Sequence, residues 1–102
     1  MLRGTTPTIT LEVDVDFSDG WTVFVTMKGI GGTVELTNDR LEFSQEEGAN
    51  IIQMALTQQE TLRLRPGKCE VQIRAIKDGL AVGSNIAALD VGRILKEGVI
   101  RG

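Results

Sequence analysis

The chain has 102 residues, the size of one domain that can bury a hydrophobic core of its own. Its 11 basic and 14 acidic residues give a net charge of −3, and the basic residues are scattered rather than gathered into the stripe typical of nucleic-acid binding. No apolar stretch approaches the roughly 20 residues of a membrane-spanning helix, and the N-terminus lacks the apolar stretch of a signal peptide. We therefore expect one domain over residues 1–102, with no nucleic-acid or membrane partner.

Apolar and polar residues alternate along the first part of the chain, which is typical of strands buried on one face. After an extended lead-in over residues 1–7, a first strand is expected over residues 8–15. Ser18-Asp19-Gly20 indicates a turn. A second strand, over about residues 21–27, is expected to pair with the first as a hairpin.

The middle of the chain predicts short strands separated by turns. Gly29-Ile30-Gly31-Gly32 breaks the alternation and is expected to be a flexible connection. Strands are expected over residues 33–36 and 41–44, with a turn at Asn38-Asp39 between them and a polar loop over residues 45–48. Residues 49–56 are apolar and have the length of either a helix or a strand, but the β-branched residues at 51 and 52 favour a strand.

One helical turn is predicted before the last strands. Thr57 is followed three residues later by Glu60, which is the capping-box pattern. It predicts a helical turn over residues 58–62, with Leu62 or Leu64 turned toward the core. Pro66-Gly67 then ends this segment.

The last part of the chain predicts a long hairpin. Residues 68–76 form the clearest strand, and Asp78-Gly79 is a strong hairpin signal. The return strand is expected over residues 81–86 and on through residues 88–95, with a kink near Gly83 or Gly92. Residues 98–102 are expected to form a loose tail.

These elements predict an all-β fold with seven or eight short antiparallel strands and one helical turn at about residues 58–62. The number and spacing of the strands favour an immunoglobulin-like β-sandwich. A small β-barrel is the alternative.

The residue types point away from enzymatic and metal-dependent chemistry. The chain has no histidine, and its single cysteine, Cys69, can neither form an internal disulfide nor hold zinc by itself. We expect Cys69 to be a small buried core residue. We therefore expect a protein that is not an enzyme, with no catalytic, cofactor-binding or metal-binding residue and no cofactor.

The acidic cluster at Asp14, Asp16 and Asp19 matches a calcium-binding EF-hand loop only in part. It departs from the EF-hand pattern because Gly20 stands at the seventh position rather than the sixth, and Val25 occupies the twelfth position, where a glutamate is needed. A looser calcium site at one end of the sandwich stays open as an alternative to a solvated turn.

Four blocks keep their order over nearly the whole chain: Arg3-Gly4-Thr5-Thr6-Pro7-Thr8, Leu56-Thr57-Gln58-Gln59-Glu60-Thr61-Leu62, Val71-Gln72-Ile73-Arg74 followed by Asp78-Gly79, and Val91-Gly92-Arg93-Ile94-Leu95. Together they resemble a group of small proteins encoded in phages and prophages of Gram-positive bacteria. This group resembles the β-sandwich modules at the start of some phage baseplate and tail proteins, which are longer and continue into receptor-binding or connecting regions.

The resemblance implies a non-enzymatic structural or assembly role, associated with the tail or baseplate. The implied partners are other virion or tail proteins, or further copies of the chain, held by non-covalent contacts. The implied location is the cytoplasm of the bacterial host or the virion. A ligand-binding or adhesion module and a small phage-encoded regulator of a host protein remain alternatives.

Two terminal segments are candidates for a protein interface, because a sandwich exposes edge strands that can pair with another chain. One is the lead-in and the other is the C-terminal segment, which is apolar for a terminus. The candidate residues are Leu2, Arg3, Thr5, Ile94, Leu95, Val99 and Ile100. For the C-terminal segment, a last strand folded onto the protein's own core is an equally open alternative.

Overall fold

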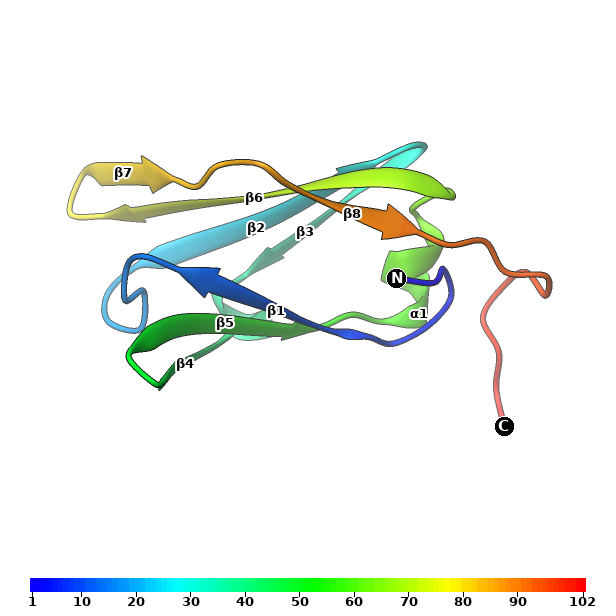
Figure 1. Ribbon diagram of the computed structural model, residues 1–102, viewed down its shortest axis with the longest axis horizontal. Helices are drawn as coiled ribbons and strands as arrows, with labels where there is room; N and C mark the ends of the chain where they lie inside the picture. The colour runs from blue at the N-terminus through cyan, green and yellow to red at the C-terminus, as the bar shows by residue number, and fades with distance from the viewer.

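The computed structural model describes residues 1–102 and folds them into two antiparallel β-sheets packed face to face (Figure 1). The smaller sheet has the order β1-β5-β4, with β1 at Thr8–Val13, β5 at Ala49–Ala55 and β4 at Glu42–Glu46. The larger sheet has the order β3-β2-β6-β7, with β3 at Gly32–Thr37, β2 at Thr22–Gly29, β6 at Gly67–Lys77 and β7 at Leu80–Gly83. The last strand, β8 at Ala87–Val91, also pairs with β6.

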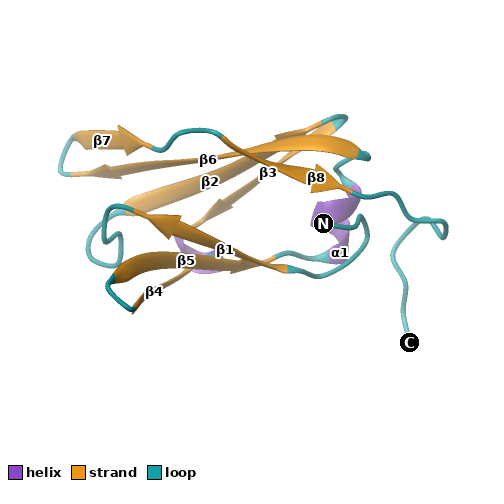
Figure 2. Cartoon of the chain, in the orientation of Figure 1, coloured by secondary structure: helices purple, strands orange, loops and turns teal.

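Two short helical segments connect the sheets: the 3-10 turn η1 at Asn38–Arg40 and the α-helix α1 at Gln58–Leu62 (Figure 2). The predicted β-sandwich is confirmed. The barrel alternative is excluded because the two sheets remain separate.

The strand order is that of an immunoglobulin-like domain with one position vacant. β1, β5 and β4 occupy the places of strands B, E and D, while β3, β2, β6 and the broken strand β7–β8 occupy the places of C′, C, F and G. The place of strand A beside β1 is empty. The lead-in instead crosses to the other sheet, where Leu2 forms a parallel bridge with Gly92. The outer edge of β1 therefore has no neighbouring strand.

The predicted hairpin between the first two strands is wrong. β1 pairs with β5, placing Leu11 opposite Ile52, whereas β2 lies in the other sheet between β3 and β6. The first strand ends at Val13, and residues 14–21 carry the chain from one sheet to the other. Phe17 is buried at this crossing and meets the ring of Trp21 edge-on, with 5.2 Å between ring centres. The chain thus crosses from one sheet to the other here, with Phe17 buried at the end of the sandwich, and does not form a local hairpin.

The alternation of apolar residues does place the core correctly. Val23, Val25 and Met27 on β2 are fully buried, and they face the inner side of the smaller sheet together with the inward residues of β6. Cys69 is among these inward residues and has no exposed surface, which confirms its expected place in the core.

The turns of the two tight hairpins follow the glycine signals. Asp78 and Gly79 have φ of 49° and 81°, and Glu47 and Gly48 have φ of 50° and 81°. Positive φ at both central residues is the type I′ geometry that matches the twist of paired strands. The predicted polar loop over residues 45–48 is wrong in length, because β4 continues to residue 46 and leaves only two residues for the turn.

The return strand is kinked beside Gly83, as expected, but it ends earlier than predicted. Residues 84–86 leave the ladder between β7 and β8. At this break the Ser84 hydroxyl accepts a hydrogen bond from the Ile73 backbone N–H at 2.9 Å, and the Ser84 backbone N–H donates to the Ile73 carbonyl at 2.9 Å. These bonds satisfy the backbone N–H and carbonyl groups of Ile73 on β6, beside the break between β7 and β8. β8 ends at Val91, so the prediction of a strand reaching residue 95 is wrong.

The helical turn forms as the capping box predicts. The Thr57 hydroxyl accepts from the Glu60 backbone N–H at 3.2 Å, and the Thr57 backbone N–H donates to the Glu60 carboxylate at 2.9 Å. Of the two leucines expected to turn inward, Leu64 is fully buried. The segment after α1 packs on the glycine-rich β2–β3 turn, where a Cβ on Gly32 would collide with the backbone oxygen of Arg63. The glycine run is therefore a site of close backbone approach.

Candidate interaction surfaces

The structure brings the two predicted interface segments to the same end of the domain. The N-terminus and the C-terminal segment both lie beside α1 (Figure 1). The Arg3 backbone N–H donates to the Gly92 carbonyl at 3.2 Å, and the Arg3 guanidinium forms an ion pair with Glu97 at 2.7 Å. Two segments from opposite ends of the sequence thus contribute to one surface.

Arg3 itself is engaged within the chain. Its Nε donates to the Leu64 carbonyl at 2.7 Å and its second guanidinium nitrogen donates to the Leu62 carbonyl at 3.0 Å. The side chain is only 14% exposed. Arg3 therefore satisfies backbone carbonyls at the C-terminal end of α1 and ties the lead-in to that turn.

Thr5 and Ile94, two further predicted interface residues, also make contacts inside the domain. The Thr5 hydroxyl donates to the Leu2 carbonyl at 2.7 Å. The Ile94 side chain is half-buried against Gly4, where an added Cβ would lie 3.0 Å from its terminal carbon. These contacts hold the lead-in and the start of the C-terminal segment to the body of the domain.

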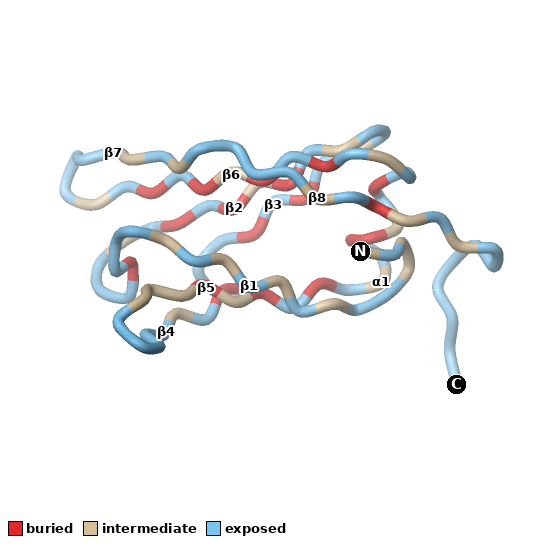
Figure 3. Tube along the Cα trace, viewed as in Figure 1, coloured by how far each residue is buried: buried red, intermediate tan, exposed pale blue.

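The other four predicted interface residues are exposed apolar side chains, and we call them the terminal apolar residues: Leu2, Leu95, Val99 and Ile100. Their exposed fractions are 52%, 91%, 42% and 54%. Figure 3 shows the C-terminal segment as an exposed, irregular stretch of chain that leaves the domain. Sequence reasoning thus located apolar side chains that the fold leaves in water.

The C-terminal segment forms no strand on the core of its own domain. After Ile94 every residue is exposed, and the backbone of the last apolar residue, Ile100, is bound by one side chain. The Gln58 side-chain amide donates to the Ile100 carbonyl at 3.1 Å and accepts from the Ile100 backbone N–H at 2.9 Å. This pair of hydrogen bonds is the arrangement that a neighbouring β-strand would offer to an extended chain.

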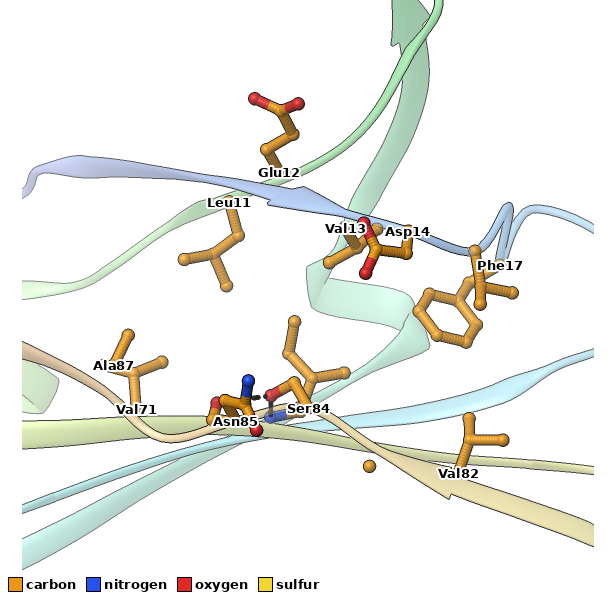
Figure 4. A pocket seen from close by; sticks show the side chains of 13 residues that line it. Leu11, Glu12, Val13, Asp14, Phe17, Val71, Val82, Ser84, Asn85 and Ala87 are labelled. Atoms are coloured by element: carbon orange, nitrogen blue, oxygen red, sulfur yellow. Dashed lines mark hydrogen bonds between the residues drawn. The ribbon is translucent and has the colours of Figure 1, made fainter.

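A second surface, which the sequence did not indicate, is a groove of about 420 Å³ between the edges of the two sheets (Figure 4). Leu11 and Val13 enter it from β1, and Phe17 lies at one end. Val71 and Val82 line the opposite wall. We call this space the edge groove. It depends on the distance between two strands remote in sequence, so no local pattern could reveal it.

The polar groups around the edge groove are acidic or neutral. Glu12 and Asp14 of the β1 wall are exposed, and Ser84 and Asn85 lie on the other wall. No basic residue lines the groove. The rim therefore presents negative charge beside an apolar interior.

The acidic turn beyond β1 is organised by its own hydrogen bonds. Asp16 accepts from the Ser18 hydroxyl at 2.6 Å and from the Ser18 backbone N–H at 3.0 Å. These hydrogen bonds, led by that from the hydroxyl, lower the pKa of the Asp16 carboxyl. Nowhere does the chain bring together three or more His, Cys, Asp or Glu side chains as a group that could hold a metal ion.

The remaining titratable groups with shifted pKa values are the buried Cys69 and Glu60 and the partly exposed Arg40. Burial raises the pKa of the Cys69 thiol. Arg40 binds the Glu60 carboxylate through two hydrogen bonds, at 2.7 Å and 3.0 Å, and this contact lowers the pKa of Glu60 despite its burial. Every buried side-chain nitrogen and oxygen has a hydrogen-bond partner. The contacts of these groups stabilise the fold and do not indicate a binding site.

Comparison with protein-family models finds no matching family, and comparison with curated proteins finds no similar protein. Neither helical segment is long and apolar enough to cross a membrane. The function therefore has to be inferred from the terminal apolar residues and the edge groove.

Proposed function

We propose that this protein is a non-enzymatic structural or assembly module of a phage or prophage particle, associated with the tail or baseplate. It acts through contacts with other virion proteins or with further copies of itself, in the cytoplasm of the bacterial host and on the virion. The resemblance of four sequence blocks to small phage and prophage proteins supports this origin.

The observation that carries the proposal is the exposure of the terminal apolar residues. Leu95 is 91% exposed, and Leu2 and Ile100 are each more than half exposed, at one end of the domain. Apolar side chains on neighbouring segments gain free energy when a partner removes them from water, at about 25 cal/mol per Å² of buried apolar surface. Such a surface is more typical of a protein-binding site than of an isolated domain.

A second candidate function, a ligand-binding or adhesion module, is favoured by the edge groove. Its volume of about 420 Å³, apolar lining and few polar groups are typical of sites for small apolar ligands. Within this second proposal the protein would act as a monomer and the terminal apolar residues would play no part.

Light scattering after size-exclusion chromatography tests the first proposal. We expect the purified chain to form oligomers, or to co-purify with a tail or baseplate protein when co-expressed with its neighbouring genes. Leu95→Asp should weaken this association, because it places a charge at the most exposed of the terminal apolar residues. The control Ile30→Asp alters a residue that is 57% exposed at the β2–β3 turn and should leave association unchanged.

A chain that stays monomeric at all concentrations and binds no virion protein would contradict the proposal. Saturable binding of an apolar ligand by such a monomer would support the second candidate instead.

A further inference from the structure

The outer edge of β1 is the one place where an immunoglobulin-like sheet lacks a strand, and the edge groove lies directly beside it. We propose that this groove receives residues 98–102 of a second copy of the chain as an added strand, so that copies join head to tail. The inference rests on the proposed function and names the partner, which is another molecule of the same protein.

The shape of the edge groove suits an extended chain. Leu11 and Val13 point from β1 toward Val71 and Ala87 on the other wall (Figure 4). A strand added beside β1 would use the unpaired backbone edge of β1 and would direct every second side chain into this space. Five residues of extended chain span about 16 Å, comparable to the stretch of residues 11–15 that lines the groove.

The C-terminal segment has a matching alternation. In an extended conformation Gly98, Ile100 and Gly102 face one side, while Val99 and Arg101 face the other. With Ile100 directed into the groove, one large apolar side chain fills the space and the glycines on either side add no bulk. Burial of Ile100, which is 54% exposed in its own domain, drives the contact.

The charges of the two surfaces are complementary. Glu12, which points away from the groove, and Asp14, which is exposed just beyond the end of β1, are acidic (Figure 4). In the added strand Arg101 lies on the same outward face, where opposite charges on neighbouring strands attract. An acidic donor segment would instead be repelled, because the groove contributes no basic residue.

The donor segment can be released from its own domain at low cost. It forms no strand, and its last apolar residue is held by the two hydrogen bonds to Gln58. The segment leaves the domain near α1, whereas β7, which contributes to the groove, lies at the other end of the sandwich (Figure 1). Donor and acceptor therefore lie on different parts of one molecule, and the contact can repeat from copy to copy into a ring or a filament.

Disulfide trapping between two singly labelled chains tests the contact directly. Both chains carry Cys69→Ala, which removes the only native thiol. One also carries Val13→Cys in the groove and the other Ile100→Cys. After mixing under oxidising conditions, we expect at least ten-fold more cross-linked heterodimer than with the control chain Ile30→Cys, altered at the β2–β3 turn, whose exposure of 57% is close to the 54% of Ile100.

Peptide binding provides a test that does not depend on the cysteine variants folding. A synthetic peptide of residues 93–102 is titrated into the isotope-labelled native chain. We expect amide shifts in β1 and β7, with at least ten-fold weaker binding for a peptide carrying Arg101→Glu. Gln58→Ala in the full chain should increase self-association several-fold, because it frees the donor segment.

Cross-linking no stronger than with the Ile30→Cys control, or peptide shifts that avoid β1 and β7, would overturn the inference. If the chain still forms oligomers, or binds a virion protein, the proposed function survives that failure. If the peptide binds in the groove while the native chain neither self-associates nor binds a virion protein, the groove accepts a strand, but the proposed function and the head-to-tail assembly fail.

Discussion

The two long sides of the sandwich are closed in different ways. On one side β3 and β4 are joined by η1, from which Arg40 reaches the Glu60 carboxylate and the Ala55 carbonyl. Leu36 and Leu41 are buried along this side. On the other side β1 and the broken strand β7–β8 are not paired, and the edge groove separates them. The molecule thus has one side bridged by η1, which we call the sealed side although a hollow of about 420 Å³ lies beside Arg40 and Leu41, and one open side that no connection bridges.

The difference shows which side of the sandwich is stabilised by internal contacts and which side keeps a surface free for a binding partner. On the sealed side apolar side chains are buried, and the Arg40–Glu60 ion pair joins η1 to α1, the two helical segments that connect the sheets. The open side leaves Leu11 and Val13 half-buried, and the outer edges of β1 and β7 both remain unpaired there. Isolated domains usually protect such an edge, so an unprotected edge favours a role in binding.

The largest predicted effect compares the same substitution on the two sides. Leu36→Ala on β3 removes a side chain that is 3% exposed and should cost about 3 kcal/mol of unfolding free energy. Leu11→Ala on β1 removes a half-buried side chain facing the groove and should cost about 1 kcal/mol, since little new cavity forms. Urea unfolding followed by the fluorescence of Trp21, the only tryptophan, measures both.

Equal losses for the two variants, at concentrations where the chain is monomeric, would contradict the distinction between the sides. They would indicate that β1 and β7–β8 close on each other in solution.

The second prediction concerns the ion pair of the sealed side. Glu60→Gln should lower the unfolding free energy by about 1–2 kcal/mol at neutral pH, because the charge-assisted hydrogen bonds from Arg40 are weakened. The pKa of Glu60 is lower in the folded state than its ordinary value of about 4.3. Its stabilising contribution is therefore complete above that value and is lost as the pH falls through the lowered value.

The difference between wild type and Glu60→Gln should accordingly shrink on acidification, as measured by denaturant unfolding at a series of pH values. Glu35→Gln serves as the control, because Glu35 is exposed and forms no ion pair. A difference that stays constant down to strongly acidic pH would show that the glutamate charge does not stabilise this side.

The smallest predicted effect lies at the hairpin that begins the open side. Gly79 has φ of 81° and no atom within 4 Å of an added Cβ, so Gly79→Ala changes only the backbone energy of the turn. We expect a loss of about 1 kcal/mol, measured by thermal or urea unfolding. Gly83→Ala, at ordinary φ and with its nearest atom at 3.7 Å, should change stability by only a few tenths of that amount. Equal effects would show that the positive φ is relaxed in solution.

Local patterns predicted the local elements well. The alternation of β2 and β6, the capping box from Thr57 to Glu60 and the turn at Asp78-Gly79 all appear as expected. Each depends on residues within a few positions of one another. The terminal apolar residues could also be located, because apolar side chains beyond the last strand are visible in the sequence.

Partners remote in sequence could not be predicted in the same way. The first strand was expected beside the second, but Leu11 lies opposite Ile52. The role of Arg3 as a brace for the end of α1 also depends on contacts with residues about 60 positions away. The edge groove escaped prediction for the same reason, since its walls come from β1 and from residues 71–87.

By itself the sequence determined which residues face inward, where the chain turns and that the core is aliphatic, because side-chain direction in a strand follows from local backbone geometry. Only the tertiary structure decided which strands are neighbours and which edge stays unpaired. Strand pairing depends on burial shared between distant segments, and here that burial sends the lead-in to β8 and leaves the outer edge of β1 open.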